Sequence, residues 1–170
     1  MQSSVPIAKR AYDAVKSGDL DALASMVDAD SSVVNASTPF GSLLHVAADK
    51  GHLNIVRYLV QKGADINLND GIVGGSPIGS AASSGHADVV KYLLEHGALL
   101  DVSEPNRNPL FGAIHGGHFE VASLLIDRGI DTSVVYNGEN MRNMDAKAFA
   151  EEWGRTDILN LLNQRYGKRA

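Results

Sequence analysis

The sequence repeats one pattern at intervals of 34 and 32 residues, and this periodicity limits the possible folds more than any other feature. A glycine followed by a histidine marks each copy, at Gly51, Gly85 and Gly117. Each copy is long enough for two short helices and a connection. Two short helices cannot bury both of their apolar faces alone, so such copies must pack on neighbours of the same kind. The sequence therefore predicts an elongated stack of helix pairs.

The copy from Ser42 to Asn67 shows how the sequence defines one helix pair. Ser42 can cap a first helix, because a serine hydroxyl accepts a hydrogen bond from an unpaired N–H group of the first turn. Gly51 ends that helix, since glycine adopts positive φ angles at little cost. A second helix is predicted to end at Gly63. Its apolar stripe, with residues three and four apart, consists of Leu53, Val56, Leu59 and Val60.

When the copies are aligned, several columns keep one type of residue. The columns contain alanine (Ala47, Ala81, Ala113), a large aliphatic residue (Leu44, Ile78, Leu110), histidine (His52, His86, His118) and a closing glycine (Gly63, Gly97, Gly129). This pattern resembles the ankyrin repeat, whose T-P-L-H-x-A-A, G-H and L-L-x-x-G-A-D segments recur here in register. Two weaker copies, at 14–23 and 150–159, flank the clear ones. The resemblance therefore covers about the whole chain.

The resemblance implies an all-α ankyrin-repeat solenoid of about five helix-turn-helix units, with β-hairpin fingers and degenerate capping units at both ends. The whole chain, 1–170, is expected to form one domain. We expect approximate units at 5–36, 37–69, 70–102, 103–135 and 136–167. In the last unit, Lys147 falls in the column of large aliphatic residues. It either shifts the register or marks an exposed end face, where a lysine stem covers apolar surface while its amine reaches water.

The connections between units carry uneven turn signals. The first connection, 28–40, is rich in serine and asparagine and lacks a strong hairpin signal. The last connection, 131–144, is longer than the others. Its dipeptide Asn137-Gly138 predicts a two-residue hairpin loop, and the β-favouring residues at 134–136 predict a strand that leads into it.

Composition and charge exclude several classes of function. The net charge of −5 argues against nucleic acid and membrane as partners and favours a neutral or basic partner. The chain has no cysteine, which excludes a disulfide framework and a thiol catalyst. The start of the sequence lacks the apolar core of a signal peptide, and no apolar run approaches the roughly 18 residues of a membrane span. We therefore expect a cytoplasmic protein that is monomeric when free.

The histidines and the glycine-rich segment do not predict catalysis. His45 lies at the histidine position of the T-P-L-H segment, which in the ankyrin family bonds neighbouring backbone. Histidines one repeat apart are expected about 10 Å from each other, too far to share a metal ion with ligands at about 2 Å. No phosphate-loop lysine follows the glycines at 71–75, and no nucleophile and base recur together. We expect no enzymatic activity, no cofactor and no metal.

The resemblance implies that a protein partner binds the concave groove lined by the fingers and the inner helices. In the family pattern, the two positions after the alanine column face this groove. These candidates are Asp49, Lys50, Ser83, Ser84, His115, Glu152 and Trp153, together with Gly116. The candidates at the finger tips are Asp70, Ile72, Val73, Glu104, Asn106, Arg107, Tyr136, Glu139, Asn140 and Met141.

The aromatic candidates favour the C-terminal end of the groove as the centre of binding. Tryptophan and tyrosine are enriched in interface cores, and Trp153 and Tyr136 both lie near this end. The small residues Ser83, Ser84 and Gly116 would leave room for a protruding element of the partner. Two structural alternatives stay open. Trp153 can pack on the last helix pair, and Tyr136 can be a cross-strand packing partner in its hairpin.

A narrower resemblance concerns the block 108–158. It is similar to small bacterial ankyrin-repeat immunity proteins, which bind and neutralise a cognate antibacterial toxin. This implies that the chain inhibits a toxin that acts in the cytosol, with a basic nuclease as one candidate for an acidic inhibitor. The alternative is a general ankyrin adaptor or a regulator of an endogenous protein. A toxin-like neighbouring gene would favour immunity, and a housekeeping neighbour would favour the adaptor.

Overall fold

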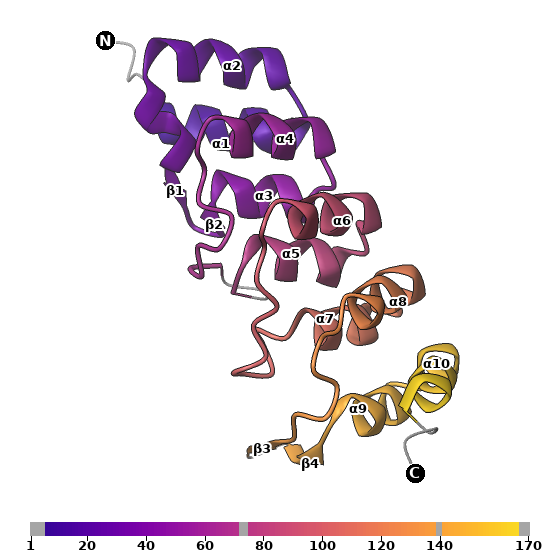
Figure 1. Ribbon diagram of the computed structural model, residues 1–170. Coiled ribbons are helices and arrows are strands. Elements are labelled where there is room, and N and C mark those ends of the chain that lie inside the picture. Colours follow the sequence, from indigo (N-terminus) through magenta and orange to yellow (C-terminus); the bar gives the residue numbers. More distant parts are fainter. Residues whose placement is uncertain (1–5, 72–74, 139–140, 167–170) are drawn as a thin grey trace.

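The computed structural model describes residues 6–71, 75–138 and 141–166, and ten α-helices lie within these ranges. They form five pairs, which follow one another from the N-terminus to the C-terminus (Figure 1). The pairs are α1 (Ile7–Ser17) with α2 (Leu20–Ala29), α3 (Leu43–Asp49) with α4 (Leu53–Gln61), α5 (Pro77–Ser84) with α6 (Ala87–Glu95), α7 (Pro109–Gly116) with α8 (Phe119–Asp127), and α9 (Ala146–Glu152) with α10 (Thr156–Tyr166); a short 3-10 helix, η1 (Ser31–Asn35), follows α2. The predicted all-α stack is therefore confirmed.

The helices form two layers. Helices α1, α3, α5, α7 and α9 pack on each other in an inner layer, and α4, α6, α8 and α10 form an outer layer with less extensive contacts. Ala47, Ala81 and Ala113, one from each of three consecutive inner helices, are fully buried. Because a methyl group is the smallest side chain that still fills space, the alanine column lets the inner helices approach closely.

The individual helices are short. The longest, α1 and α10, have 11 residues each, and isolated helices of this length are barely stable in water. Their stability therefore comes from packing between neighbouring pairs. Within the described ranges, no helix is both long and apolar enough to cross a lipid bilayer.

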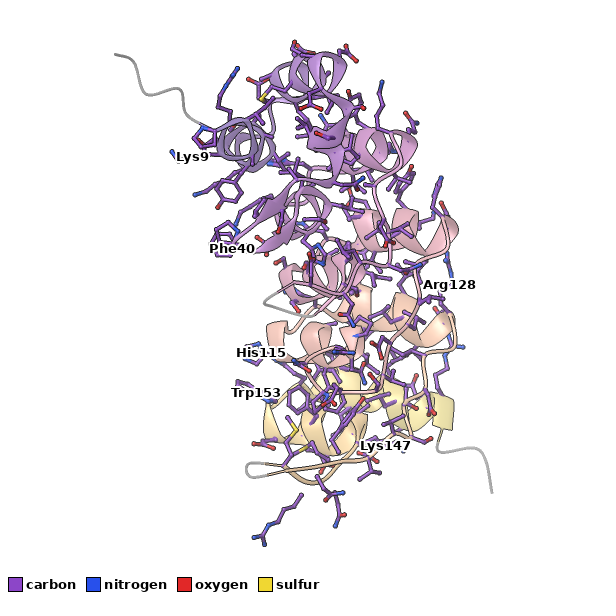
Figure 2. The ribbon with its side chains drawn as sticks, turned by 90° about the vertical axis from the view of Figure 1, so that its left-hand side faces the viewer. Lys9, Phe40, His115, Arg128, Lys147 and Trp153 are labelled. Carbon is purple, nitrogen blue, oxygen red and sulfur yellow. The ribbon has the colours of Figure 1, made fainter. Side chains whose placement is uncertain are left out.

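The inner helices from α3 onward begin at equivalent positions of the repeat. Their N-cap residues are Ser42, Ser76, Asn108 and Asp145. In the last three, the side chain accepts a hydrogen bond from a backbone N–H of the first turn. Lys147 lies two residues after Asp145, as Leu110 lies two residues after Asn108, and its side chain is half-buried. The register of the last repeat therefore holds, and Lys147 marks the end of the stack, at the bottom of Figure 2.

A histidine that follows each helix-ending glycine ties one repeat to the preceding one. Nε2 of His86 lies 2.9 Å from the carbonyl oxygen of Asp49. Nε2 of His118 lies 3.1 Å from the carbonyl oxygen of Ser83. Each bond joins the end of one inner helix to the start of the outer helix in the next repeat, so the histidine column is structural.

The two ends of the stack continue this pattern with small changes. His52 makes the same bond to the carbonyl oxygen of Lys16 at 3.3 Å. In the last repeat Arg155 replaces the histidine and donates two hydrogen bonds. Its Nε donates to the carbonyl of Ile114 at 3.0 Å, and its terminal nitrogen donates to that of His115 at 2.6 Å. A cationic fork therefore fastens the last repeat through two carbonyls instead of one.

The glycines of this column are required for two reasons. Gly51 and Gly85 have φ angles of 70° and 81°, in the left-handed region that side chains disfavour. A Cβ atom on Gly51 would lie 2.4 Å from the ring of His86, and one on Gly85 would lie 2.5 Å from the ring of His118. The glycine of one repeat and the histidine of the next therefore fit together, which explains why the pair recurs.

The first finger contains a hairpin, as the ankyrin resemblance implies, although its own residues carry no strong hairpin signal. Strand β1 (Ser37–Thr38) pairs with β2 (Gly41–Ser42) in antiparallel register. The Thr38 hydroxyl donates to the carbonyl of Gly41 at 2.7 Å and accepts the N–H of Phe40 at 3.1 Å. A threonine side chain therefore closes the turn, and the strands are too short to give a pattern of alternation.

The last finger is a hairpin, as predicted, but its first strand extends through Gly138. Strand β3 (Tyr136–Gly138) pairs with β4 (Met141–Met144), with a bulge that shifts the register. Asn137 and Gly138 lie within β3, so the prediction that they form the loop is wrong. Asn143 has a φ angle of 49°, and its N–H donates to Oδ1 of Asn137 at 2.9 Å. The Asn137 side chain therefore stabilises the bulge instead of a tight turn.

Candidate functional site

One residue of each repeat lies at the same position on the inner face of the stack, and we call these residues the inner row. The inner row consists of Lys16, Asp49, Ser83, His115 and Glu152. The carbonyl oxygens of the first four accept the bonds from the next repeat that are described above. In Figure 2, His115 and Trp153 lie on the same side of the molecule as Phe40, and Arg128 lies on the opposite side. The inner row is therefore fixed in its backbone and accessible from one side.

Lys16 belongs to this row although the sequence analysis did not select it. It stands two residues before Gly18, as Asp49 stands two residues before Gly51. The hydrogen bond from His52 to its carbonyl shows the same equivalence. The signal was therefore present in the weak first copy and could have been found by extending the glycine alignment toward the N-terminus.

Asp49 lies at the centre of a polar cluster that joins two repeats. Its carboxylate lies 2.9 Å from the amine of Lys50 and accepts the hydroxyl of Ser84 at 2.8 Å. Burial raises the pKa of Asp49, but the bonds from Lys50 and Ser84 outweigh it and hold the pKa below its usual value. The bond with Asp49 raises the pKa of Lys50. Three of the predicted groove residues are therefore brought together, with both charges kept at neutral pH.

The small residues of the middle repeats serve the packing of their neighbours. A Cβ atom on Gly116 would lie 2.3 Å from the ring of His118. A Cβ atom on Gly112 would lie 2.3 Å from the hydroxyl of Ser83. Glycine at these positions is therefore required within the stack, because the side chains of His118 and Ser83 occupy the space beside them.

A chain of aromatic rings runs through the C-terminal half of the inner face. Phe111 lies edge-on to Tyr136 at 5.0 Å between centroids and stacks on Phe149 at 4.3 Å. Trp153 lies 6.0 Å from Phe149 and meets the ring of His115 edge-on at 4.3 Å. Trp153 remains 43% exposed. It therefore packs on the last repeats with one side and reaches the surface with the other, and we call these five rings the C-terminal ring chain.

Tyr136 is the buried end of this ring chain, with 7% of its surface exposed. Its hydroxyl donates to the carbonyl of Val102 at 2.7 Å and accepts Nδ2 of Asn108 at 3.0 Å. Burial raises the pKa of its phenol. The expectation of an exposed finger-tip residue is therefore wrong for Tyr136. It braces the last two fingers against each other, which is a packing role but with partners outside its own hairpin.

The other finger candidates are dispersed. Asp70 is exposed, and its carboxylate lies 3.6 Å from Nδ1 of the buried His45. Arg107 faces Asp101 at 3.8 Å within the finger that connects helices α6 and α7. Glu104 and Asn106 are exposed, and Met141 is half-buried. Ile72, Val73, Glu139 and Asn140 lie outside the described residues.

A hollow lies at the N-terminal end of the inner face, and we call it the N-terminal pocket. Its volume is about 340 Å³. Helices α1, α3 and α5 and the first finger form its walls, which include Tyr12, Lys16, Phe40, His45, Asp49 and Lys50. The sequence pattern favours the C-terminal end and does not single out Tyr12 or Phe40. The signal for Phe40 was its place between Pro39 and Gly41, where a turn exposes a large apolar side chain.

The titratable groups of the described residues form no cluster that could hold a metal ion, because no three histidine or carboxylate side chains among them lie close enough together. His45 is 1% exposed, and both of its ring nitrogens are engaged, Nδ1 with Ser42 and Nε2 with the carbonyl of Gly75. Burial lowers the pKa of His45. This histidine therefore fastens the finger between helices α4 and α5 to helix α3, which is the structural role that the family pattern implies.

Comparison with known proteins agrees with this geometry. The family model described as ankyrin repeats (3 copies) matches residues 11–104 and 44–136, which together span most of the chain. The chain therefore belongs to the ankyrin-repeat family. Members of this family are generally binding modules without enzymatic activity, and the chain is therefore a protein–protein interaction module. No curated protein matches the sequence.

Proposed function

We propose that this ankyrin-repeat protein is an immunity-type inhibitor, which binds a toxin or effector domain on its inner face and blocks it. The observation that carries the proposal is the fixed geometry of the inner row. Four of its five carbonyls are bonded by the next repeat. The Asp49–Lys50–Ser84 cluster and the His115–Trp153 pair also fix side chains on this face.

A rigid binding face suits an inhibitor for a physical reason. Ordering a flexible side chain on binding costs about 0.5–1.5 kcal/mol, and a preorganised face avoids much of this cost. The saving appears mainly as slow dissociation. An inhibitor must stay bound for as long as its target could be active, whereas an adaptor has to exchange its partners.

The charge of the chain supports the choice of target class. A net charge of −5 attracts a basic protein and accelerates association with it. Enzymes that degrade nucleic acids carry basic surfaces because their substrates are polyanions. A toxin with nuclease activity therefore fits this acidic chain better than an acidic target does.

The test begins with capture of the partner. The tagged full chain is used to pull down proteins from its native host, and the captured proteins are identified by mass spectrometry. We expect one small protein that stops growth when it is expressed alone and becomes harmless when this chain is expressed with it. A captured housekeeping protein without toxicity would contradict the proposal and make the chain an adaptor or regulator.

A pair of variants shows whether the captured protein uses the inner face. Trp153→Ala removes a ring from the inner face, and Phe119→Ala removes a ring from helix α8 in the outer layer of helices. Both side chains are 43% exposed, so the two variants are matched. Capture should fall with Trp153→Ala and remain with Phe119→Ala. Equal capture by both variants would exclude the C-terminal part of the inner face.

A further inference from the structure

We infer that the N-terminal pocket binds an acidic segment of the protein partner in which a large apolar side chain is flanked by carboxylates. This inference rests on the proposed function only in that the inner face binds a protein. It adds a second binding point, at the end of the stack opposite to Trp153, and assigns the chemistry that this point recognises.

The apolar part of the pocket consists of two aromatic rings. Tyr12 on helix α1 and Phe40 on the first finger stack with centroids 5.9 Å apart and planes inclined by 17°. Phe40 is 55% exposed, more than Trp153. A large apolar side chain in water is costly, and such residues are enriched at the cores of interfaces. The stacked pair therefore forms a platform on which an apolar side chain of the partner can lie.

The platform is held in place before any partner arrives. The Thr38 hydroxyl bonds both the N–H of Phe40 and the carbonyl of Gly41. Gly41 has a φ angle of 101°, and a Cβ atom there would lie 3.0 Å from the ring of His45. The turn therefore sits against helix α3 in a conformation that only glycine adopts easily, and the exposed ring of Phe40 projects from a fixed base.

The charges around the platform favour a carboxylate. Lys16 and Lys50 border the pocket, and Asp49 is its only acidic wall residue among those described. The Asp49 carboxylate is already bonded to Lys50 and Ser84. The amine of Lys16 lies 5.9 Å from the centre of the Tyr12 ring and forms no ion pair with a carboxylate of the described residues. The pocket thus carries an excess of positive charge on a chain whose net charge is −5.

The opposite end of the inner face has the opposite sign. Glu151 and Glu152 are exposed beside Trp153, and neither has an ion-pair partner in the described parts of the chain. An acidic segment is therefore repelled from the C-terminal ring chain and attracted to the N-terminal pocket. Figure 2 shows Phe40 and Trp153 well separated along the same side. The charge difference fixes the direction in which a partner lies along the stack.

The test uses three synthetic peptides with blocked ends, Gly-Glu-Phe-Glu-Gly, Gly-Lys-Phe-Lys-Gly and Gly-Glu-Ser-Glu-Gly. Each is titrated into the isotope-labelled full chain, and backbone amide shifts are followed by nuclear magnetic resonance. The acidic phenylalanine peptide should move the amides of Phe40 and Lys50 with saturation and leave that of Trp153 unchanged. The other two peptides should bind at least threefold more weakly, because each lacks one of the two recognised features.

Two substitutions and two matched controls test the pocket itself. Lys16→Glu should weaken the acidic phenylalanine peptide by about threefold, as expected for one exposed charge pair, and Phe40→Ala by about tenfold, as expected for an interface anchor. Lys91→Glu on helix α6 and Leu99→Ala, an exposed residue that follows helix α6, should have no effect. Thermal melts verify that each variant is folded.

Several results would overturn the inference. Equal binding of the basic peptide would exclude charge recognition, and shifts centred on Trp153 would place the acidic site at the wrong end. An absence of saturable shifts, with the variants folded, would exclude the pocket. These outcomes are separate from the proposed function, because a toxin captured through the Trp153 end alone would support immunity while the pocket assignment fails. Conversely, peptide binding with a harmless captured protein would support the pocket and contradict immunity.

Discussion

The two ends of the inner face both present aromatic rings, but they use them differently. In the C-terminal ring chain the rings pack on one another from the buried Tyr136 to the half-exposed Trp153. In the N-terminal pocket, Phe40 stacks on Tyr12 and leaves a hollow beside it. The first arrangement stabilises the last repeats and exposes a ring at its edge. The second leaves apolar surface uncovered and surrounds it with lysines. An aromatic residue at a groove position therefore says little about binding until its neighbours are known.

The largest expected effect is the loss of stability on replacing Tyr136, because this ring joins the ring chain to two fingers. Tyr136→Ala should lower the free energy of unfolding by about 3–5 kcal/mol, as for other buried aromatic residues. It also removes the hydrogen bonds that the Tyr136 hydroxyl makes with Nδ2 of Asn108 and with the carbonyl of Val102. Urea unfolding followed by circular dichroism measures this loss.

The matched variant Tyr136→Phe removes only the hydroxyl and should cost about 1 kcal/mol. If Tyr136→Ala unfolds at nearly the same urea concentration as the natural chain, the ring is not part of the core. The contrast between the two ends of the inner face would then be lost.

The next effect concerns the alanine column that connects the two ends. Ala81 is fully buried in helix α5, in the middle of the layer of inner helices. Ala81→Leu should cost roughly 1–3 kcal/mol, because a larger side chain forces the neighbouring helices apart. The same substitution at the exposed Ala29 is the control and should change stability little. Unchanged urea midpoint and slope for Ala81→Leu would mean that the two ends are not packed through this column.

A smaller effect depends on pH and involves the wall of the N-terminal pocket. Burial lowers the pKa of His45 in the folded protein, whereas a histidine of the unfolded chain takes up a proton near pH 6.5. Between these two pKa values the unfolded state binds more protons than the folded state. The free energy of unfolding should therefore be greatest above pH 6.5 and decrease as the pH falls below it.

The measurement is urea unfolding at several pH values for the natural chain and for His45→Asn. The other five histidines are common to both proteins, so the difference between the two pH profiles isolates His45. The variant should be less stable at neutral pH and should lose less stability on acidification. Parallel profiles would show that the proton on His45 does not affect folding.

The smallest effects are expected for the exposed rings that distinguish the two ends. Trp153→Ala should lower the free energy of unfolding by about 1 kcal/mol, because two ring contacts are lost, and Phe40→Ala by about 0.5 kcal/mol, because one is lost. Thermal melts beside Phe119→Ala measure these differences. A large loss of stability with Phe40→Ala would mean that its ring is needed for folding, and a binding role would no longer explain its exposure.

The repeated columns made the fold predictable from the sequence. A helix stack has one period, so a glycine, an alanine and a histidine that recur in register fix the ends of the helices, their buried side and the link to the next repeat. Even Lys147, which conflicts with its column in polarity, is correctly placed by the spacing of Asp145 and Gly154. Periodicity therefore carried more information than the type of any single residue.

The site was less predictable because it depends on contacts between residues that no period relates. Tyr136 has β-favouring neighbours in the sequence, but its partners Val102 and Asn108 belong to the preceding finger. The hairpin around Phe40 depends on one threonine hydroxyl, a signal too small to distinguish from other serine- and threonine-rich loops. Lys16 and Tyr12 lie in the weak first repeat, where degeneration of the pattern hides their equivalence to groove positions.

The bond between a histidine of one repeat and a carbonyl of the preceding repeat has a consequence for how such a chain can change in length. The bond joins neighbours only, and the donor and acceptor recur once in every unit. If a duplicated unit were inserted between the third and fourth repeats, its histidine would donate to a carbonyl of the third repeat. Its own carbonyl would accept the bond from the fourth repeat, so no bond would be lost. The chain can thus grow by whole modules. Each added module would lengthen the distance between the lysine-rich pocket and Trp153 by one step, which would adapt the same two end sites to a longer target.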